Sequence, residues 1–185
     1  LSDASDNITI TVTDAGNVNQ ISTIAGRTSA TNITLDSTIT DDLYNFIQTA
    51  DNSSNTTNFA TVLSHTTNEP IVLNSYTVTS NNNVTAINAL LAAAEAGVTG
   101  TITDNNGSEL LNTTVDLTTT ADDSITVDVG TVNPTADNLA ELKKLADQAG
   151  ITRINGDLTI SAADVDTIAG YNNLTSSKNY INFVL

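Results

Sequence analysis

Residues 124–160 constrain the fold more than any other stretch, because a strand, a helix and a second strand follow one another there. Hydrophobic and polar residues alternate over residues 125–129, which is the period of a half-buried strand. Pro134 and Thr135 then begin a helix, and Gly150 is expected to cap its C-terminus. The hydrophobic residues expected on the buried face of this helix are Leu139, Leu142, Leu145, Ala146 and Ala149.

Residues 151–160 follow as a return strand with a bend at Asn155-Gly156, and two earlier stretches repeat the same order of elements. The expected fold class is α/β, with a mixed, largely parallel sheet and packed helices. A hairpin at Asp122 is expected to supply the antiparallel pairing. The chain is predicted to be a single domain over residues 1–185, built from three strand-helix-strand-helix repeats at approximately 6–70, 71–120 and 121–185.

The middle of the chain contains further predicted elements. Residues 71–78 are predicted to form either one bent strand or a tight hairpin about Asn74-Ser75. A helix follows that ends at Gly97, because its hydrophobic residues recur three and four positions apart. Residues 104–111 are predicted to form a short helix or a turn. Other helices are expected to begin at Asp14, Thr40 and Ser161.

The charge of the chain excludes some partners. The formal net charge is -16, and Lys and Arg together number only five. Nucleic acid is excluded as a partner because so few cations cannot neutralise a run of phosphates. No hydrophobic run approaches the roughly 18 residues of a membrane-spanning helix, so membrane insertion is not expected either.

The chain contains neither cysteine nor methionine. Disulfides and thiolate metal sites are therefore not possible. A chain without an initial methionine is expected to be a processed product or a fragment, and a secreted mature protein is the simplest account. The expected location is extracellular or at the cell surface.

Catalytic motifs are absent from the sequence. His65 is the only histidine and lies in a polar stretch, where a solvated loop residue is expected. The chain also lacks the Gly-x-Ser-x-Gly pattern of a nucleophile elbow. A pair of carboxylates could hydrolyse a glycosidic bond, but the acidic residues occur mainly at predicted helix starts and turns. The chain is therefore predicted not to be an enzyme, and a polysaccharide hydrolase is the third hypothesis.

Three aspartates are candidate calcium ligands: Asp104, Asp122 and Asp123. Calcium prefers carboxylate and carbonyl oxygens, and Asp104 precedes an Asn-rich segment of suitable residue types. The spacing of a full EF-hand loop is missing, and capping of helices and turns explains the same residues. No cofactor other than calcium is predicted.

The two ends of the chain carry strand-like hydrophobic segments. A hydrophobic strand at the end of a chain either completes its own sheet or inserts into the sheet of a neighbour. The candidate assembly residues are Ile8, Ile10, Val12, Tyr180, Ile181, Phe183 and Leu185.

Two short phrases resemble a known type of repeat. The segment Ile10-Thr11-Val12-Thr13-Asp14-Ala15-Gly16 and the segment Gly100-Thr101-Ile102-Thr103-Asp104 resemble the Thr/Asn-rich repeats of large secreted bacterial surface proteins, cyanobacterial ones among them. The resemblance implies an extracellular role that is structural or adhesive. It implies no catalytic residues.

The first functional hypothesis is a secreted structural subunit whose copies assemble into an extracellular filament or surface layer by pairing of sheet edges or terminal strands. Its partners would be other copies of the chain. The alternative is an adhesin or phage-fibre-type repeat module that binds a cell-surface glycan.

Overall fold

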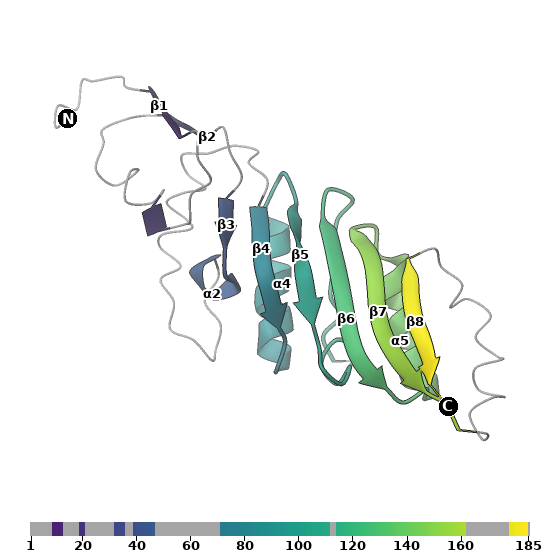
Figure 1. Cartoon of the computed structure of the whole chain (residues 1–185). Helices are drawn as coiled ribbons and strands as arrows, with labels where there is room; N and C mark the ends of the chain where they lie inside the picture. Colours follow the sequence, from purple (N-terminus) through teal and green to yellow (C-terminus); the bar gives the residue numbers. More distant parts are fainter. Residues whose placement is uncertain are drawn as a thin grey trace.

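The computed structural model describes residues 9–12, 19–20, 32–35, 39–46, 71–111, 114–161 and 178–184. A six-stranded parallel sheet dominates these residues, and its strands lie side by side in the order of the sequence (Figure 1). The six strands are β3 (Ile39–Asp41), β4 (Ile71–Thr77), β5 (Val98–Thr103), β6 (Ser124–Val132), β7 (Ile151–Thr159) and β8 (Asn179–Val184). A separate parallel pair is formed by β1 (Thr9–Val12) and β2 (Asn32–Leu35).

The sequential strand order makes the chain a succession of similar coils. Ile71 is the partner of Val98 and Ile125 is the partner of Ile151, so each partner lies 27 or 26 residues further along. Each coil therefore contributes one strand and one crossover, and it contacts mainly the coils before and after it. A period of this size is typical of solenoid and repeat architectures.

The α/β class is confirmed, but the expected antiparallel pairing is wrong. β6 pairs in parallel with β5 on one side and with β7 on the other, so neither of its backbone edges remains for a hairpin at Asp122. All pairings among the described strands are parallel, so the sheet is not mixed there. Three strand-helix-strand-helix repeats are not confirmed, because parts of the first and last repeats lie outside the described residues.

The two predicted long helices are present as α4 (Asn81–Ala93) and α5 (Ala136–Asp147). Thr135 caps the start of α5, where its hydroxyl oxygen accepts a hydrogen bond from the amide of Asn138 at 3.2 Å. The predicted end of α5 is wrong, because the helix stops at Asp147 with Gln148 as its C-cap. Gly150 lies beyond it, packed against Thr120 of the preceding crossover.

Other predicted elements are confirmed or shifted. Residues 71–77 form one strand with an irregular register, so the bent-strand interpretation is correct and the hairpin is wrong. Residues 104–111 form turns, as expected. The helix predicted from Thr40 begins later, as α2 (Leu43–Phe46), because Thr40 and Asp41 pair with β4 in the sheet. The helix predicted after Asp14 lies outside the described residues except for Asn19 and Gln20, which are helical, and the one after Ser161 lies wholly outside them.

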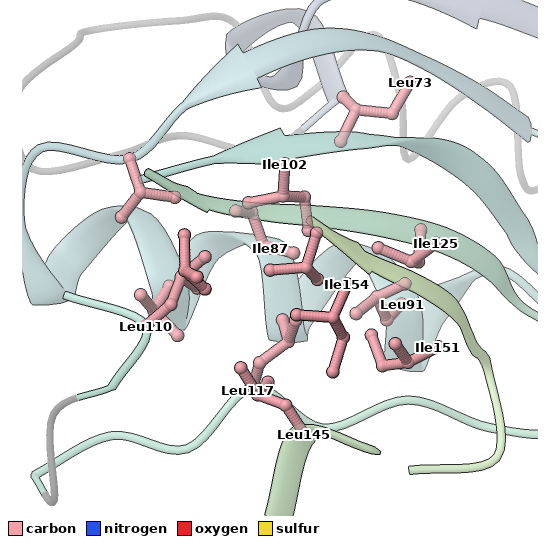
Figure 2. Close-up of a cluster of buried hydrophobic side chains, with 14 of the residues drawn as sticks. Leu73, Ile87, Leu91, Ile102, Leu110, Leu117, Ile125, Leu145, Ile151 and Ile154 are labelled. Carbon is pink, nitrogen blue, oxygen red and sulfur yellow. The ribbon is translucent and has the colours of Figure 1, made fainter. Parts of the chain in front are cut away.

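The hydrophobic core occupies one side of the sheet. In Figure 1, α4 and α5 lie behind the strands, on the same face, and α2 contacts α4. Figure 2 shows strand residues Ile102 and Ile154 lying toward Ile87 of α4, and all three are fully buried members of one hydrophobic cluster. The alternate strand residues point to the opposite face. That open face carries polar side chains, among them the half-buried Thr101 and Thr126.

The parallel register can be tested because the chain contains no cysteine. Thr99 and Ser124 are adjacent partners on the open face, so the double variant T99C/S124C should be joined by a short thiol cross-linker or a disulfide. The control variant T103C/S124C places the two thiols at opposite ends of the strands and should not cross-link within one molecule. Mass spectrometry of digested monomer would measure both. Cross-linking of the control alone would contradict the parallel pairing of β5 and β6.

Candidate functional site

A polar trough on the open face of the sheet is the main candidate site. It has a volume of about 750 Å³ and lies over the middle and C-terminal parts of β5, β6, β7 and β8. None of the described side chains that line it is hydrophobic. Its lining residues are Thr103, Asn105, Asp128, Gly130, Thr131, Arg153, Asn155, Gly156, Asp157 and Asn182.

The sheet register brings these residues together. Thr103, Asp128 and Asn155 are successive partners across β5, β6 and β7, and Asp157 is the partner of Asn182 across β7 and β8. Their side chains share the open face because their neighbours in the strands, such as Val127 and Ile154, are buried on the other side. Residues more than 75 positions apart in the chain therefore meet in one depression.

Two glycines in neighbouring strands form the floor of the trough. Gly130 has a φ of +62°, and a Cβ atom placed there would lie 2.1 Å from the carbonyl oxygen of Asn105. Gly156 lies in the adjacent strand, where the register of β6 and β7 shifts between Asp128 and Thr131. Because neither glycine carries a side chain, the sheet is hollow at this point. Glycines and irregular registers inside sheets often mark places where a ligand approaches the backbone.

Hydrogen bonds hold several trough side chains in place. Asp128 Oδ1 accepts from the Gly130 amide at 3.0 Å, and Asn155 Oδ1 accepts from Arg153 Nε at 2.7 Å. Asp157 Oδ1 accepts from Asn182 Nδ2 at 2.9 Å. Within the described residues, the second polar atoms of Asp128, Asn155 and Asp157 have no hydrogen-bond partner. Each of these side chains is thus fixed through one atom and presents the other to the trough.

The candidate calcium ligand Asp104 lies at the end of β5 and is only 2% exposed. Its Oδ2 atom accepts from the amides of Glu109 and Leu110, both at 2.8 Å. Its Oδ1 atom accepts from the amide of Asn106 at 3.4 Å. The carboxylate therefore organises the turn that follows β5 and replaces the missing backbone partners of that turn.

The candidate ligands Asp122 and Asp123 lie before β6, at the opposite end of the sheet from Asp104. Asp123 is buried, and its carboxylate accepts from the Val98 amide at 2.8 Å and from the Thr120 amide at 2.7 Å. Asp122 is exposed. Nowhere in the described ranges do three or more His, Cys, Asp or Glu side chains form a group that could hold a metal ion. The calcium site remains a prediction from the sequence.

The candidate assembly strands both have a partner within the chain. β1 pairs with β2, and β8 completes the main sheet beside β7, from Asn179 to Val184. Ile10 and Val12 are in β1, and Tyr180, Ile181 and Phe183 are in β8. Ile8 and Leu185 lie outside the described residues.

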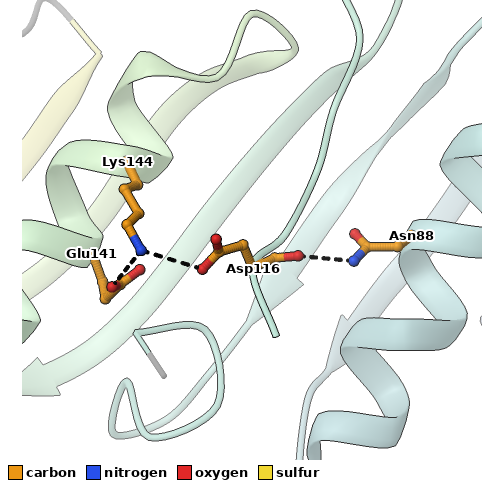
Figure 3. Close-up of polar contacts among 4 residues, drawn as sticks. All are labelled: Asn88, Asp116, Glu141 and Lys144. Atoms are coloured by element: carbon orange, nitrogen blue, oxygen red, sulfur yellow. Dashed lines mark hydrogen bonds and ion pairs between the residues drawn. The ribbon is translucent and has the colours of Figure 1, made fainter. Parts of the chain in front are cut away.

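A polar bridge joins the two long helices through the segment between β5 and β6 (Figure 3). Asn88 of α4 donates through Nδ2 to the carbonyl oxygen of Asp116 at 2.8 Å. The Asp116 carboxylate lies 3.6 Å from Lys144 Nζ of α5, which also donates to Glu141 at 2.8 Å. The Glu141 hydrogen bond is the main cause that raises the pKa of Lys144 above its ordinary value of 10.5. Because Glu141 is buried, Lys144 neutralises a carboxylate that has little access to water.

No family model, curated protein or solved structure matches this chain. None of the described helices is long and apolar enough to cross a membrane. The function is therefore inferred from the geometry of the described residues.

The trough was not predicted from the sequence. Asp128, Asn155 and Gly156 were recognised there only as parts of strands, because periodicity places a residue on a face but does not identify its neighbours in other strands. The one signal that could have indicated the site is a glycine in each of two successive strands, at Gly130 and Gly156.

Variants of the neighbouring residues Asp122 and Asp123 distinguish a structural role of these carboxylates from a metal-binding role. The variant D123A should lower the free energy of unfolding by about 2–4 kcal/mol, because two backbone amides lose a charged partner. The matched variant D122A should change it by less than about 0.5 kcal/mol. Denaturant unfolding in the presence of a chelator would measure both. A large effect of D122A that appears only with added calcium would contradict the structural assignment.

The raised pKa of Lys144 gives a pH-dependent prediction. A raised pKa in the folded state means that the contribution of Lys144 is complete below about 10.5 and is lost as the pH rises through the folded-state pKa. The variant K144M should therefore be less stable than the wild type at about pH 8 and approach it at about pH 11.5. The control K143M removes a lysine that pairs only with exposed Asp147 and should change little at either pH. A K144M deficit that stays constant with pH would refute the ion pair as its cause.

Proposed function

We propose that the chain is a structural subunit whose copies associate edge to edge, extending the parallel sheet from one molecule to the next. The observation that carries this proposal is the sequential strand order, which leaves β8 at one end of the sheet. Within the described residues, β8 pairs on one side only, with β7. The next strand of a continuous sheet would add to its other side.

The backbone of β8 presents hydrogen-bonding groups to that outer side. The carbonyl oxygen of Lys178, just before β8, accepts from the amide of Ile154 in β7 at 2.8 Å, and that of Val184 accepts from the amide of Ile160, just after β7, at 2.7 Å. The polar groups of successive strand residues point alternately to the two sides of the strand, and the register of β8 is regular. The amides and carbonyls of Ile181 and Phe183 therefore point away from β7.

Within its described residues, β8 also lacks the charges, proline and register shift that protect many edge strands. Natural edge strands are blunted by charges, proline, bulges or very short length. β8 has six residues, Asn-Tyr-Ile-Asn-Phe-Val, with no charge, no proline and no register shift. Val184, at its end, is 44% exposed and is the one large hydrophobic residue exposed among the residues with described burial.

The net charge would control when association occurs. Copies with a formal charge of -16 repel one another at low ionic strength, whereas salt screens this repulsion within about 8–10 Å. Backbone pairing is short-range and is weakened much less by salt. Association favoured by high ionic strength fits an extracellular or surface location, and calcium bridging of acidic surfaces would act in the same direction.

The finer organisation belongs to the same proposal. Helical crossovers in β4-α4-β5 and β6-α5-β7 alternate with the turn-rich crossover between β5 and β6. This alternation supports a unit of two strands, and three such units would make up the single domain expected over residues 1–185. The resemblance to Thr/Asn-rich surface-protein repeats supports the same extracellular structural role.

The proposal is tested by placing a charge on the edge strand. The variant V184K replaces the exposed valine of β8 with a lysine and should leave the monomer folded. The protein concentration at which half of the copies are associated should rise at least about tenfold. The matched control T99K adds the same charge on the open face of central β5 and should associate like the wild type. Analytical ultracentrifugation and electron microscopy at high salt would measure the assemblies.

A second variant targets the backbone alone. In I181P, the proline removes an amide that points away from β7, so the β7–β8 pairing stays possible while the outer side loses a donor. Assemblies of wild type, V184K and I181P that are equal in midpoint and form would rule out pairing through β8, as would a wild type that stays monomeric at all salt concentrations.

A further inference from the structure

We propose that the polar trough over β5–β8 binds a short oligosaccharide that carries no acidic groups. This site goes beyond the edge-to-edge association and does not depend on it, because every lining residue belongs to one molecule. It lies on the open face of the sheet, whereas association is assigned to the backbone edge of β8.

The chemistry of the lining fits a ligand rich in hydroxyl groups. Carboxylates only accept hydrogen bonds, a guanidinium only donates them, and amides and hydroxyls do both. The trough contains all of these types, and its described lining is polar, unlike that of ordinary small-molecule pockets, which are mostly apolar. Sugar hydroxyls donate and accept at once, so they can satisfy neighbouring groups of both kinds.

The arrangement of unpartnered atoms favours recognition of several hydroxyls together. Within the described residues, the free acceptor oxygens of Asp128 and Asp157 and the free amide nitrogen of Asn155 face the same depression. Because the other atom of each side chain is already bonded, little side-chain entropy remains to be lost on binding. The trough crosses four strands, a span of roughly 14 Å at the usual strand spacing, which accommodates a short chain of sugars.

Charge selects among possible ligands. The trough is lined by two carboxylates, Asp128 and Asp157, and one guanidinium, Arg153, and the whole chain carries a formal charge of -16. Phosphorylated or acidic ligands are therefore repelled, both locally and at longer range. A neutral or amino-bearing glycan meets no such barrier.

The affinity of a single site is expected to be low. No aromatic side chain is among the described lining residues, so these residues offer no flat hydrophobic surface on which a sugar ring could stack. Several such sites on an assembled array would bind a polysaccharide more tightly than one site does, because the later contacts are intramolecular.

The experiment is an NMR titration of the isotope-labelled full chain under low-salt conditions in which it is monomeric. The probes are cellotetraose and maltotetraose as neutral chains, a tetramer of glucosamine as an amino-bearing chain, and a tetramer of galacturonic acid as an acidic chain. At least one of the first three should produce saturable shifts confined to trough amides, such as those of Gly130 and Gly156. The acidic tetramer should produce none.

Two variants tie the binding to the trough. N155A and D157A should each weaken the affinity about tenfold or more, because each removes an atom that contacts the ligand and the partner of a second trough side chain. The control E95A removes an exposed acid far from the trough and should leave the affinity unchanged. If D157A fails to fold, the affinity of D157N, which keeps the shape of the side chain, is measured in its place.

The inference is overturned if no neutral or amino-bearing tetramer gives saturable shifts. It is also overturned if the shifts lie outside the trough, if the acidic tetramer binds as well as the others, or if N155A and the aspartate variant that folds bind like E95A. Loss of association in V184K with intact sugar binding would separate this site from the edge-to-edge function.

Discussion

The parallel pairing of each strand with the next one along the chain is the interaction on which the rest of the structure depends. Because the strands follow one another in one direction and parallel crossovers are right-handed, helices α4 and α5 lie on the same face, and that face becomes the core. The opposite face is left to polar residues and holds the trough. The same order leaves β8 at the end of the sheet, where a further strand can be added.

Side chains that reach from one coil to the next secure this pairing at the ends of the strands. Asp123, before β6, accepts from the amide of Val98 at the start of β5. Gln148, after α5, accepts from the amide of Thr119, and its own carbonyl accepts from Lys178 at 2.7 Å. The crossovers thus satisfy polar backbone groups in neighbouring coils. This use explains how a chain with so few cations buries the carboxylates of Asp104 and Asp123, whose partners are backbone amides, whereas buried Glu141 pairs with Lys144.

Local elements could be predicted from the sequence, whereas the neighbours of each strand could not. The hydrophobic spacing in residues 84–91 and the helix start at Pro134 and Thr135 predicted that α4 and α5 exist, since both signals act within a few residues. Their ends were placed too late, at Gly97 and Gly150, whereas the helices stop at Ala93 and Asp147. The hairpin at Asp122 was wrong because a turn sequence does not reveal that both edges of β6 are already paired. The trough depends on the register of strands about 26 residues apart, which periodicity within one strand does not contain.

Residue-resolved hydrogen exchange during association tests the edge-to-edge account most directly. In dilute protein at low salt, the amide hydrogens of Ile181 and Phe183 should exchange rapidly, because these amides point away from β7. The amide hydrogens of Tyr180 and Asn182 should exchange slowly under the same conditions, because these amides are paired with β7. At high salt and concentration, Ile181 and Phe183 should gain protection of at least about tenfold, with little change in central β6. Association without added protection at these two amides, or with protection gained mainly on the open face, would contradict pairing through β8.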